Sequence, residues 1–314
     1  MSEPVVVVRN VSKKFLETPA LTDLTFEVNN GEIFGLVGPD GAGKTTLFRI
    51  LTTLILPDSG TATVLGLDVA RDLWAIRSRV GYMPGRFSLY GDLTVEENLS
   101  FFASVFGTTV AKGYDLIAPI YKQIEPFAKR RAEALSGGMK QKLALSCALV
   151  HRPDILFLDE PTTGVDAVSR REFWDQLGHL RDSGLTVVVS TPYMDEAMRC
   201  DRVGLIQNGR LLDIDSPGDI GRHYPLPLIS VTSSQRYKLL LALRKAPNVH
   251  SVYPFGAELH YTDKRAGIDP QAVSSEIEAY AKSQGFDDAT AHPISAGIED
   301  SFMELMGSSV QQAS

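Results

Sequence analysis

Short apolar runs recur along the first part of the chain, and segments with a helical pattern lie between them. Residues 155–158 are a continuous apolar run, which is typical of a central parallel strand, and residues 186–190 are predicted to form another buried strand. Further strands are predicted at residues 5–8, 24–28, 31–37, 61–64, 203–207 and 210–214, and helices at 47–56, 73–80 and 166–182. Strands that alternate with helices predict a doubly wound α/β sheet.

The pattern becomes helical between residues 84 and 150, which predicts a helical insertion into the α/β fold. Thr94 and Glu97 have the spacing of a capping box, in which each side chain bonds the backbone N–H of the other residue. Gly107 can end the helix that starts there. A second helix is expected near residues 114–124.

A segment rich in Pro and Gly at residues 216–227 predicts a domain boundary. The strands expected beyond it are 228–231, 249–254, 258–261 and 289–294, with helices at 237–245 and 270–284. This β-α-β-β-α-β order predicts a small α+β domain of the ferredoxin-like type. The expected organisation is a first domain at 1–218, a linker at 219–227, an accessory domain at 228–306 and a disordered tail at 307–314.

One nonapeptide lies between a predicted strand and a predicted helix, and its sequence is Gly38-Pro39-Asp40-Gly41-Ala42-Gly43-Lys44-Thr45-Thr46. This is the context that the P-loop pattern GxxxxGK[ST] requires. The glycines let backbone N–H groups surround phosphate oxygens, and the helix N-terminus adds partial positive charge. Lys44 brings a full charge to the outer phosphates, and the Thr45 hydroxyl can bind Mg²⁺. The motif predicts a nucleoside triphosphate site rather than a glycine-rich turn that binds nothing.

Two carboxylates, Asp159 and Glu160, follow the apolar run at residues 155–158. A carboxylate at the carboxyl end of a strand beside a P-loop can hold Mg²⁺, directly or through water. Glu160 can then orient or deprotonate an attacking water molecule. Alone, the pair would also fit two solvated acids at the end of a strand, and the P-loop favours the catalytic interpretation.

A second candidate phosphate site is the segment Leu135-Ser136-Gly137-Gly138-Met139-Lys140-Gln141, which precedes a helix predicted to run to about Val150. Ser136 fits the N-cap position, and its hydroxyl and the nearby N–H groups can also bind phosphate. One nucleotide does not need two such sites from the same chain. The segment is therefore either an ordinary helix start or a site that meets a nucleotide held by another chain.

Composition narrows the expected partners and location. The net charge of −7 gives no general basic field, so nucleic acid is not the expected partner. No apolar run approaches the roughly 20 residues that span a bilayer, and the N-terminus lacks the regions of a signal peptide. Cys147 and Cys200 are expected to be reduced thiols packed in helical segments. These features favour a cytoplasmic location.

Four segments occur in order and carry a family resemblance, namely residues 38–46, 135–141, 155–161 and Gly164-Val165-Asp166. Across about residues 5–215 the chain resembles the ATP-binding subunits of ABC transporters. The resemblance implies an ATPase that uses ATP and Mg²⁺ and forms a head-to-tail dimer with itself or a homologous subunit. Each ATP would lie between the P-loop of one chain and Ser136, Gly137, Gly138 and Gln141 of the other.

The same resemblance assigns further roles. Phe15 would stack on adenine, although it also fits an ordinary loop aromatic packed on the sheet. Thr45 and Asp159 would hold Mg²⁺, and Glu160 would be the general base. Asp166 would lie at the dimer seam.

Within the family, the chain is most similar to the ATPases of drug and antibiotic exporters, whose membrane subunits are separate proteins of the ABC-2 type. This implies a peripheral position on the inner face of the cell membrane, with residues 85–99 in the face that meets the membrane subunit. Residues 297–305 are similar to the end of the accessory domain in these exporters, although Ile298, Phe302 and Leu305 fit any amphipathic helix.

Two positions depart from the family pattern. The usual Gln after Gly81-Tyr82-Met83-Pro84 is Gly85, and the usual His after Thr191 is Pro192. Neither residue has a polar side chain, and a lost hydrogen bond to a charged phosphate costs about 1.5–3 kcal/mol, or about ten- to a hundredfold in rate. Arg86 either replaces the missing donor or is a solvated surface residue.

The sequence therefore leaves two functions open. The first is an ATPase subunit that powers export through a separate membrane protein, with slow turnover. The alternative is a hydrolysis-impaired cassette that binds ATP and pairs with an active partner ATPase. A soluble ABC protein of translation or DNA repair is disfavoured, because the chain has one cassette and no long coiled-coil insertion.

Overall fold

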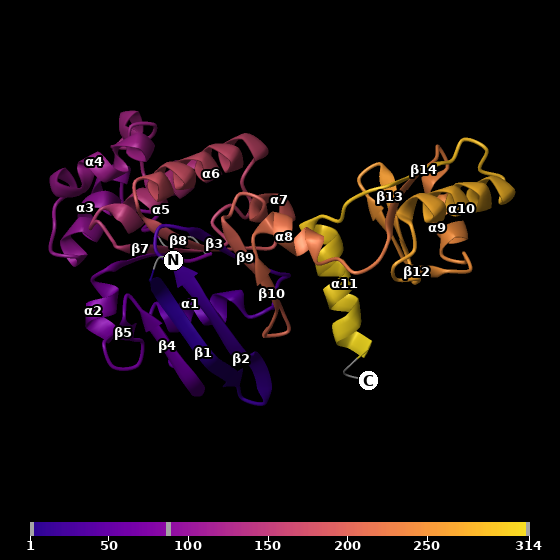
Figure 1. The fold of residues 1–314 in the computed structure, drawn as a ribbon. Helices are drawn as coiled ribbons and strands as arrows, with labels where there is room; N and C mark the ends of the chain where they lie inside the picture. Colours follow the sequence, from indigo (N-terminus) through magenta and orange to yellow (C-terminus); the bar gives the residue numbers. More distant parts are fainter. Residues whose placement is uncertain (1–2, 86–88, 312–314) are drawn as a thin grey trace. The chain divides into compact units, whose positions relative to one another are not determined.

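The computed structural model describes residues 3–85 and 89–311, with side chains described up to residue 306. The chain divides into two compact units, Met1–Pro217 and Gly218–Ser314 (Figure 1). The expected linker at 219–227 includes most of a short helix, α8 (Pro217–Arg222). Across residues 3–85 and 89–311, no helix is both long enough and apolar enough to cross a membrane.

Unit 1 is built on a six-stranded sheet. Its order is β10 (Arg210–Asp215), β9 (Arg202–Gln207), β3 (Ile33–Val37), β8 (Thr186–Thr191), β7 (Ile155–Asp159) and β6 (Val80–Met83). Strands β9, β3, β8, β7 and β6 are parallel, and β10 pairs antiparallel with β9 after a turn at Asn208-Gly209. The predicted α/β class is confirmed. The prediction of a helix over residues 73–80 is wrong in part, because Val80 begins strand β6 and α2 (Leu73–Arg77) ends before it.

A second, antiparallel sheet packs in the same unit, in the order β2 (Thr18–Asn29), β1 (Pro4–Phe15), β4 (Ser59–Val64) and β5 (Leu67–Asp68). Strands β1 and β2 are longer than predicted, because they pair with each other from Pro4 and Asn29 to Phe15 and Thr18. Phe15 therefore ends a strand instead of lying on a connection. Helix α1 (Lys44–Leu51) lies between the two sheets (Figure 1), and its Phe48 meets Phe157 of β7 edge to face.

Helix α1 differs from the prediction at both ends. It begins at Lys44 inside the P-loop motif, and it ends at Leu51 instead of residue 56. Thr53 has a positive φ of 62° just beyond the C-cap Thr52, a conformation that does not continue an α-helix. The apolar residues that follow form turns, so their hydrophobicity alone was a poor guide to the helix end.

The helical insertion contains α3 (Val95–Val105), α4 (Val110–Tyr121) and α5 (Gly137–Leu149). Two 3-10 helices, Glu125–Phe127 and Ala132–Ala134, connect α4 to α5. The capping box is confirmed, because Glu97 N–H donates to Thr94 Oγ1 at 3.2 Å and Thr94 N–H donates to Glu97 Oε2 at 2.8 Å. Gly107 follows the helix with a φ of 64°, as a helix-ending glycine does.

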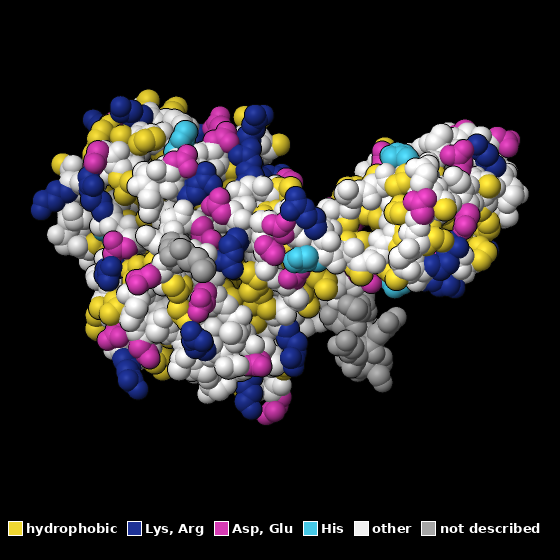
Figure 2. All heavy atoms as spheres, in the orientation of Figure 1, with side chains coloured by type: hydrophobic (Ala, Val, Ile, Leu, Met, Phe, Trp, Pro, Cys, Tyr) yellow, Lys and Arg dark blue, Asp and Glu magenta, His cyan; other side chains and the backbone are white. Residues whose placement is uncertain are grey.

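Two more helices complete unit 1, α6 (Ala167–Asp182) and α7 (Met194–Ala197). Helices α5 and α6 lie on the face of the parallel sheet opposite α1 (Figure 1). Cys147 and Cys200 are free and buried, as predicted, and burial raises the pKa of both thiols. Cys200 follows α7 and is not itself in a helix. Figure 2 shows acidic and basic side chains interspersed on the visible face of unit 1.

Unit 2 has the predicted β-α-β-β-α-β order. Its elements are β11 (Leu228–Thr232), α9 (Arg236–Leu243), β12 (Val249–Phe255), β13 (Glu258–Asp263), α10 (Pro270–Ser283) and β14 (Thr290–Pro293). The sheet order is β12-β13-β11-β14, with every neighbour antiparallel. A further helix, α11 (Ile298–Gln311), includes part of the segment that was expected to be a disordered tail.

Candidate functional site: a P-loop edge and a separate serine–glycine turn

The segments with predicted chemistry leave the parallel sheet at one edge. Because β3, β6, β7 and β8 are parallel, their carboxyl ends meet there. The P-loop follows β3, Gly85 follows β6 after Pro84, Glu160 follows β7 and Pro192 follows β8. This is the edge at which open α/β sheets bind ligands.

The backbone of the P-loop has the shape of an anion-binding turn. Gly41 and Gly43 have φ values of 78° and 106°, a region that residues with a side chain rarely adopt. A Cβ on Gly43 would lie 2.5 Å from the carbonyl oxygen of Ala20, so space as well as φ requires glycine there. Gly43 is the N-cap of α1, which directs the first backbone N–H groups of the helix toward the loop.

Lys44 is buried in this loop and its ammonium group is held at three points. Nζ donates to the carbonyl oxygens of Gly38 at 2.7 Å and Pro39 at 2.9 Å. It also forms an ion pair with Glu160 Oε1 at 3.0 Å, in which the lysine side chain is 2% exposed and the glutamate 23%. The structure thus brings together the P-loop lysine and the predicted general base.

Asp159 and Glu160 share one partner, Ser190 on the neighbouring strand β8. Ser190 Oγ donates to Asp159 Oδ1 at 2.7 Å and accepts from the Glu160 N–H at 3.0 Å. Glu160 has a positive φ of 49°, an uncommon conformation for a non-glycine residue and one that clusters at functional sites. No local sequence pattern singles out Ser190, because its pairing with Asp159 and Glu160, 31 and 30 residues away, depends on the strand order.

A short polar network supports the loop after β8. Glu196 is buried and its two carboxylate oxygens accept from Thr162 Oγ1 and Thr191 Oγ1, each at 2.6 Å. Thr191 Oγ1 in turn accepts from the Tyr193 N–H at 3.0 Å. The network joins the segment after Glu160 to the loop containing Pro192. The network was not predicted from the sequence, where its only sign is the acidic residue Glu196 in the segment that forms the short helix α7.

Gly85 passes close to Asp159. A Cβ on Gly85 would lie 2.9 Å from the Asp159 carbonyl oxygen and 3.8 Å from its Oδ2. Both Gly85 and Glu160 line a cavity of about 150 Å³, together with Gly137 and Gln141 of α5. Arg86, the candidate replacement for the missing Gln, lies outside the described residues.

The serine–glycine turn forms a second group. Ser136 is the N-cap of α5, and its Oγ accepts from the Met139 N–H at 3.4 Å. Gly138 packs against Ser169, where a Cβ would lie 2.6 Å from the Ser169 hydroxyl oxygen. Asp166 caps α6 by accepting from the N–H groups of Val168 and Ser169, and these bonds lower the pKa of its carboxyl. Within the described part of the chain, no hydrogen bond or ion pair joins Ser136, Gly137 or Gly138 to the P-loop.

Two predicted site residues lie in other surroundings. Gln141 is buried, its Nε2 donates to the Pro161 carbonyl oxygen, and its Oε1 has no partner among the described residues. Phe15 is 48% exposed at the end of β1, and Lys13 Nζ lies 5.8 Å from its ring centroid.

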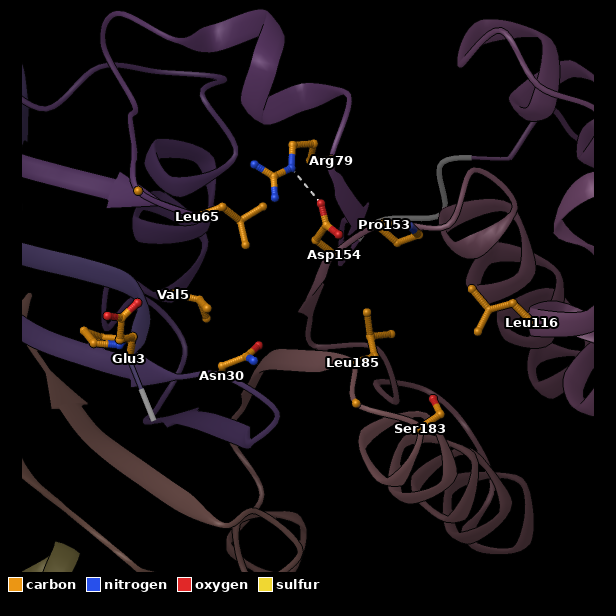
Figure 3. Close-up of a pocket in the computed structure, with 13 residues that line it drawn as sticks. Glu3, Val5, Asn30, Leu65, Arg79, Leu116, Pro153, Asp154, Ser183 and Leu185 are labelled. Carbon is orange, nitrogen blue, oxygen red and sulfur yellow. Dashed lines mark hydrogen bonds and ion pairs between the residues drawn. The ribbon is translucent and has the colours of Figure 1, made fainter. Parts of the chain in front are cut away.

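A larger pocket of unit 1 is not at this edge. It has a volume of about 870 Å³ and is lined by residues that precede the parallel strands, among them Asn30, Arg79 and Asp154. Figure 3 shows the ion pair between Arg79 Nε and Asp154 Oδ2, at 2.6 Å, on its wall. It therefore lies at the amino ends of the strands, away from Lys44 and Glu160.

An apolar pocket of about 500 Å³ lies beside α2, β6, α3 and α5, and its walls include Trp74, Leu89, Val105 and Ala144. Trp74 is 79% exposed and Val105 60%. Tyr82 is also in the lining, and burial, followed by the charge of Asp159, raises its pKa to about 12. Exposed apolar side chains gathered around a hollow are typical of an interaction site.

The fold and this edge define a P-loop nucleotide-binding cassette. The profile described as ABC transporter matches residues 21–163. The chain is 34% identical over 291 residues to the Nod factor export ATP-binding protein I of Paraburkholderia xenovorans (strain LB400), an alignment that covers 86% of this chain and 96% of that protein. The chain therefore belongs to the ABC transporter ATP-binding family, and the resemblance seen in its motifs is confirmed.

Other relatives agree. The chain is 44% identical over 220 residues to the probable multidrug ABC transporter ATP-binding protein YbhF of Escherichia coli (strain K12), covering 69% of this chain but only 38% of that protein. A dimeric post-hydrolysis state of an ATP-binding cassette bound to ADP and Pi superposes with a TM-score of 0.61 at 27% identity, covering 67% of this chain and 98% of that one. The ATP-binding subunit of another ABC transporter superposes with a TM-score of 0.64 at 28% identity, covering 70% and 93%.

Proposed function

We propose that this chain is the ATP-binding subunit of an exporter and that it hydrolyses ATP to drive a separate membrane subunit. The cluster of Lys44, Asp159 and Glu160 at one edge of the parallel sheet is the observation that carries the proposal. The names of the relatives above, which include a multidrug transporter and a Nod factor exporter, support export as the process. We propose an ABC-2 type membrane partner and a position on the cytoplasmic face of the cell membrane.

In the proposed ATP site, the N–H groups of residues 38–46 and the Lys44 ammonium bind the phosphates. The buried Lys44 supports this, because its charge is held inside a ring of backbone that is shaped for an anion. Phe15 is exposed enough to stack on the adenine ring.

Thr45 and Asp159 are the residues that would hold Mg²⁺, since a hydroxyl and a carboxylate are both hard oxygen ligands. Asp159 is buried, but Ser190 bonds only its Oδ1, so Oδ2 remains as a ligand. Mg²⁺ bound there would neutralise charge on the phosphate oxygens.

Glu160 would accept the proton of the attacking water. In this structure its carboxylate contacts Lys44, and the Glu160 N–H is fixed by Ser190. Phosphate binding to Lys44 would compete with the Lys44–Glu160 ion pair and release the carboxylate for catalysis. Ser190 positions both Asp159 and Glu160, because it is hydrogen-bonded to each of them.

We propose that the nucleotide site is completed by a second chain, either a copy of this one or a homologue. The absence of a hydrogen bond or ion pair between Ser136, Gly137 or Gly138 and the P-loop within the described chain supports this. Asp166 packs near the same turn through Ser169 and would lie at the seam. Gln141 is buried against Pro161, so we propose that it links α5 to the segment after Glu160 instead of touching nucleotide.

The turnover is proposed to be slow. Gly85 has no side-chain donor, and a side chain there would crowd the Asp159 backbone. At Pro192 there is neither a side-chain donor nor an N–H, and the neighbouring Thr191 hydroxyl is already bonded to Glu196. The same two positions favour the second candidate, a hydrolysis-impaired cassette beside an active partner.

The apolar pocket beside α2 and α3 is the proposed docking site for the membrane subunit. Its exposed Trp74 and Val105 offer apolar area, and Leu89 from the segment at 85–99 lines it. Replacing Val105 by Asp should weaken co-purification with the membrane subunit and leave ATP binding intact. The control is Leu241→Asp, an exposed leucine (43%) on α9 in unit 2.

The decisive experiment for the activity compares the native chain with Glu160→Gln. Hydrolysis should fall at least a hundredfold, because the base is lost, while ATP affinity stays within about threefold. Glu172→Gln, an acid that pairs with Lys142 on α5, is the control and should hydrolyse normally. If Glu160→Gln turns over ATP at the native rate, Glu160 is not the base. If the native chain shows no hydrolysis with its membrane partner, the second candidate stands.

A further inference from the structure

The sheet of unit 2 has one apolar face and one polar face. Ile229, Val231, Leu259 and Tyr261 belong to the buried apolar cluster together with α9 and α10. Alternate residues point the other way, and there Ser230, His260 and Thr262 are buried although they are polar. Each of the three has a hydrogen-bond partner: Ser230 bonds Glu258, Thr262 bonds Tyr224, and His260 bonds Asp300 of α11.

Helix α11 is held against this polar face by two pairs. Asp300 Oδ1 accepts from His260 Nδ1 at 2.6 Å, and Glu304, one turn further, pairs with His250 Nε2 at 3.0 Å. Ser301 Oγ also donates to the Ile220 carbonyl oxygen at 3.1 Å. The helix is therefore fixed by polar contacts, and a gap between it and the sheet remains.

That gap is a cavity of about 210 Å³ with aromatic walls. Tyr224, Tyr253 and Phe255 line it, and the fourth ring is that of His260, which stacks on Phe255 with centroids 4.2 Å apart. The α11 side contributes Glu299, Asp300 and Met303. Aromatic faces carry negative potential, so rings around a hollow attract cations.

The charges around the cavity have one sign. Within the described residues, neither Lys nor Arg lines it, whereas two carboxylates do. The Asp300 carboxylate accepts hydrogen bonds from His260 and from the Gly297 N–H. The Glu299 carboxylate has no hydrogen bond or ion pair with any described residue. Burial raises the pKa of Tyr224 to about 12, and the negative charges of Glu304 and Asp300 act in the same direction.

We propose that this cavity binds a small organic cation with an ammonium or quaternary ammonium group, held between the aromatic rings and Glu299. The volume of about 210 Å³ suits such a group and is below the roughly 300–1,000 Å³ of pockets for drug-sized ligands, so the ligand is a small amine. Because α11 forms one wall, the bound cation would fasten the helix to the sheet.

The first test is calorimetric titration of the full chain with choline, with ethanolamine, and with 3,3-dimethylbutan-1-ol, an uncharged molecule of the shape of choline. Saturable binding of choline or ethanolamine at one site per chain is expected. The neutral alcohol should bind at least tenfold more weakly than choline, because it lacks the charge. Binding of neither cation at millimolar concentration, or equal binding of choline and the alcohol, would overturn the proposal.

Variants locate the site. Glu299→Gln should weaken binding about tenfold, and Phe255→Leu about three- to thirtyfold, the range of a cation–π contact. The matched controls are Asp287→Asn, an exposed acid before β14, and Tyr237→Leu, an exposed aromatic on α9. Both should bind like the native chain. Cation binding that survives Glu299→Gln and Phe255→Leu lies elsewhere and rejects this cavity.

A second readout concerns α11. Hydrogen exchange of the backbone amides in α11 should slow when the cation is bound, and amides of α10 on the other face of the sheet should not change. ATP binding measured on the same variants should be unaltered, so this proposal and the ATPase proposal can fail separately.

Discussion

The parallel sheet of unit 1 and the antiparallel sheet of unit 2 differ in where their polar residues lie. In the parallel strands β3, β7 and β8 every residue is buried, and the polar site residues lie at or beyond the carboxyl ends of the strands, such as Asp159 at the end of β7 and Glu160 after it. In the antiparallel sheet of unit 2, polar residues such as Ser230 and His260 lie within the strands, on one face. A parallel sheet covered on both faces has only its edges left for ligands, whereas an antiparallel sheet can give a whole face to polar groups.

This difference predicts which property of each unit a substitution should change. Substitutions at the edge of the parallel sheet should remove activity and leave the fold, because the strands keep their packing. Substitutions on either face of the unit 2 sheet should change stability or the position of α11.

The largest effect is expected for Leu239→Ala, in the core between α9 and the unit 2 sheet. Leu239 is fully buried, and removing such a side chain costs about 2–5 kcal/mol of unfolding free energy. Denaturant unfolding should show one transition moved to lower denaturant, with the ATP-protected transition of unit 1 unchanged. A single shared transition that moves as a whole would contradict the division into two units.

Lys44→Ala should weaken ATP binding and leave the fold intact. Loss of the charged contact to phosphate costs about 1.5–3 kcal/mol for each hydrogen bond, so ATP affinity should fall about tenfold to more than a hundredfold. Fluorescent-nucleotide titration measures it. The control is Lys142→Ala, a lysine of α5 that pairs with Glu172 of α6 and makes no contact with the P-loop lysine; it should bind nucleotide normally. Equal affinity of Lys44→Ala and the native chain would remove Lys44 from the site.

Much of the site at the carboxyl edge of the parallel sheet could be predicted from the sequence, because its residues lie in short contiguous segments. The P-loop, Asp159-Glu160 and the capping box of α3 each lie within one short segment. Ser190 and Glu196 were missed because their partners are brought together only by strand order. Strand β6 was missed because residues 73–80 carry a helix-like pattern up to the first residue of the strand.

In unit 2, the order of elements was predictable from alternating patterns, but the polar face was not. His260 and Asp300 are 40 residues apart, and neither local segment has a pattern that predicts their pairing. The extent of α11 was also misjudged, since a Gly-Ser-Ser sequence at 307–309 favours a tail more than a helix.

Pro192→His should raise the turnover. A restored donor to phosphate is worth about 1.5–3 kcal/mol, which corresponds to about ten- to a hundredfold in rate. Steady-state phosphate release with the membrane partner present measures it, and Pro192→Ala is the control that removes the ring without adding a donor. A rate that does not change in Pro192→His would mean that Pro192 is not what limits hydrolysis.

The smallest effect concerns pH and unit 2. Bonds from the N–H and hydroxyl groups of Ser234 and Ser233 lower the pKa of Asp288 from 3.8 to about 2. Because the folded-state pKa is lowered, this stabilisation is present above about pH 4 and is lost as the pH falls toward 2. Asp288→Asn should therefore flatten the acid dependence of unit 2 unfolding below pH 4 slightly. An unchanged acid profile in this variant would show that these bonds do not persist in solution.

The measurement that tests the account most directly is complementation between two inactive chains. Both carry Glu160→Gln to prevent turnover; one adds Lys44→Ala and the other Ser136→Arg. Neither chain alone should dimerise with ATP, measured by light scattering during size-exclusion chromatography. Mixed together they should form an ATP-dependent dimer, because one of its two sites combines an intact P-loop with an intact Ser136 turn. A mixture that stays monomeric, like its separate components, would contradict a nucleotide site shared between two copies of this chain.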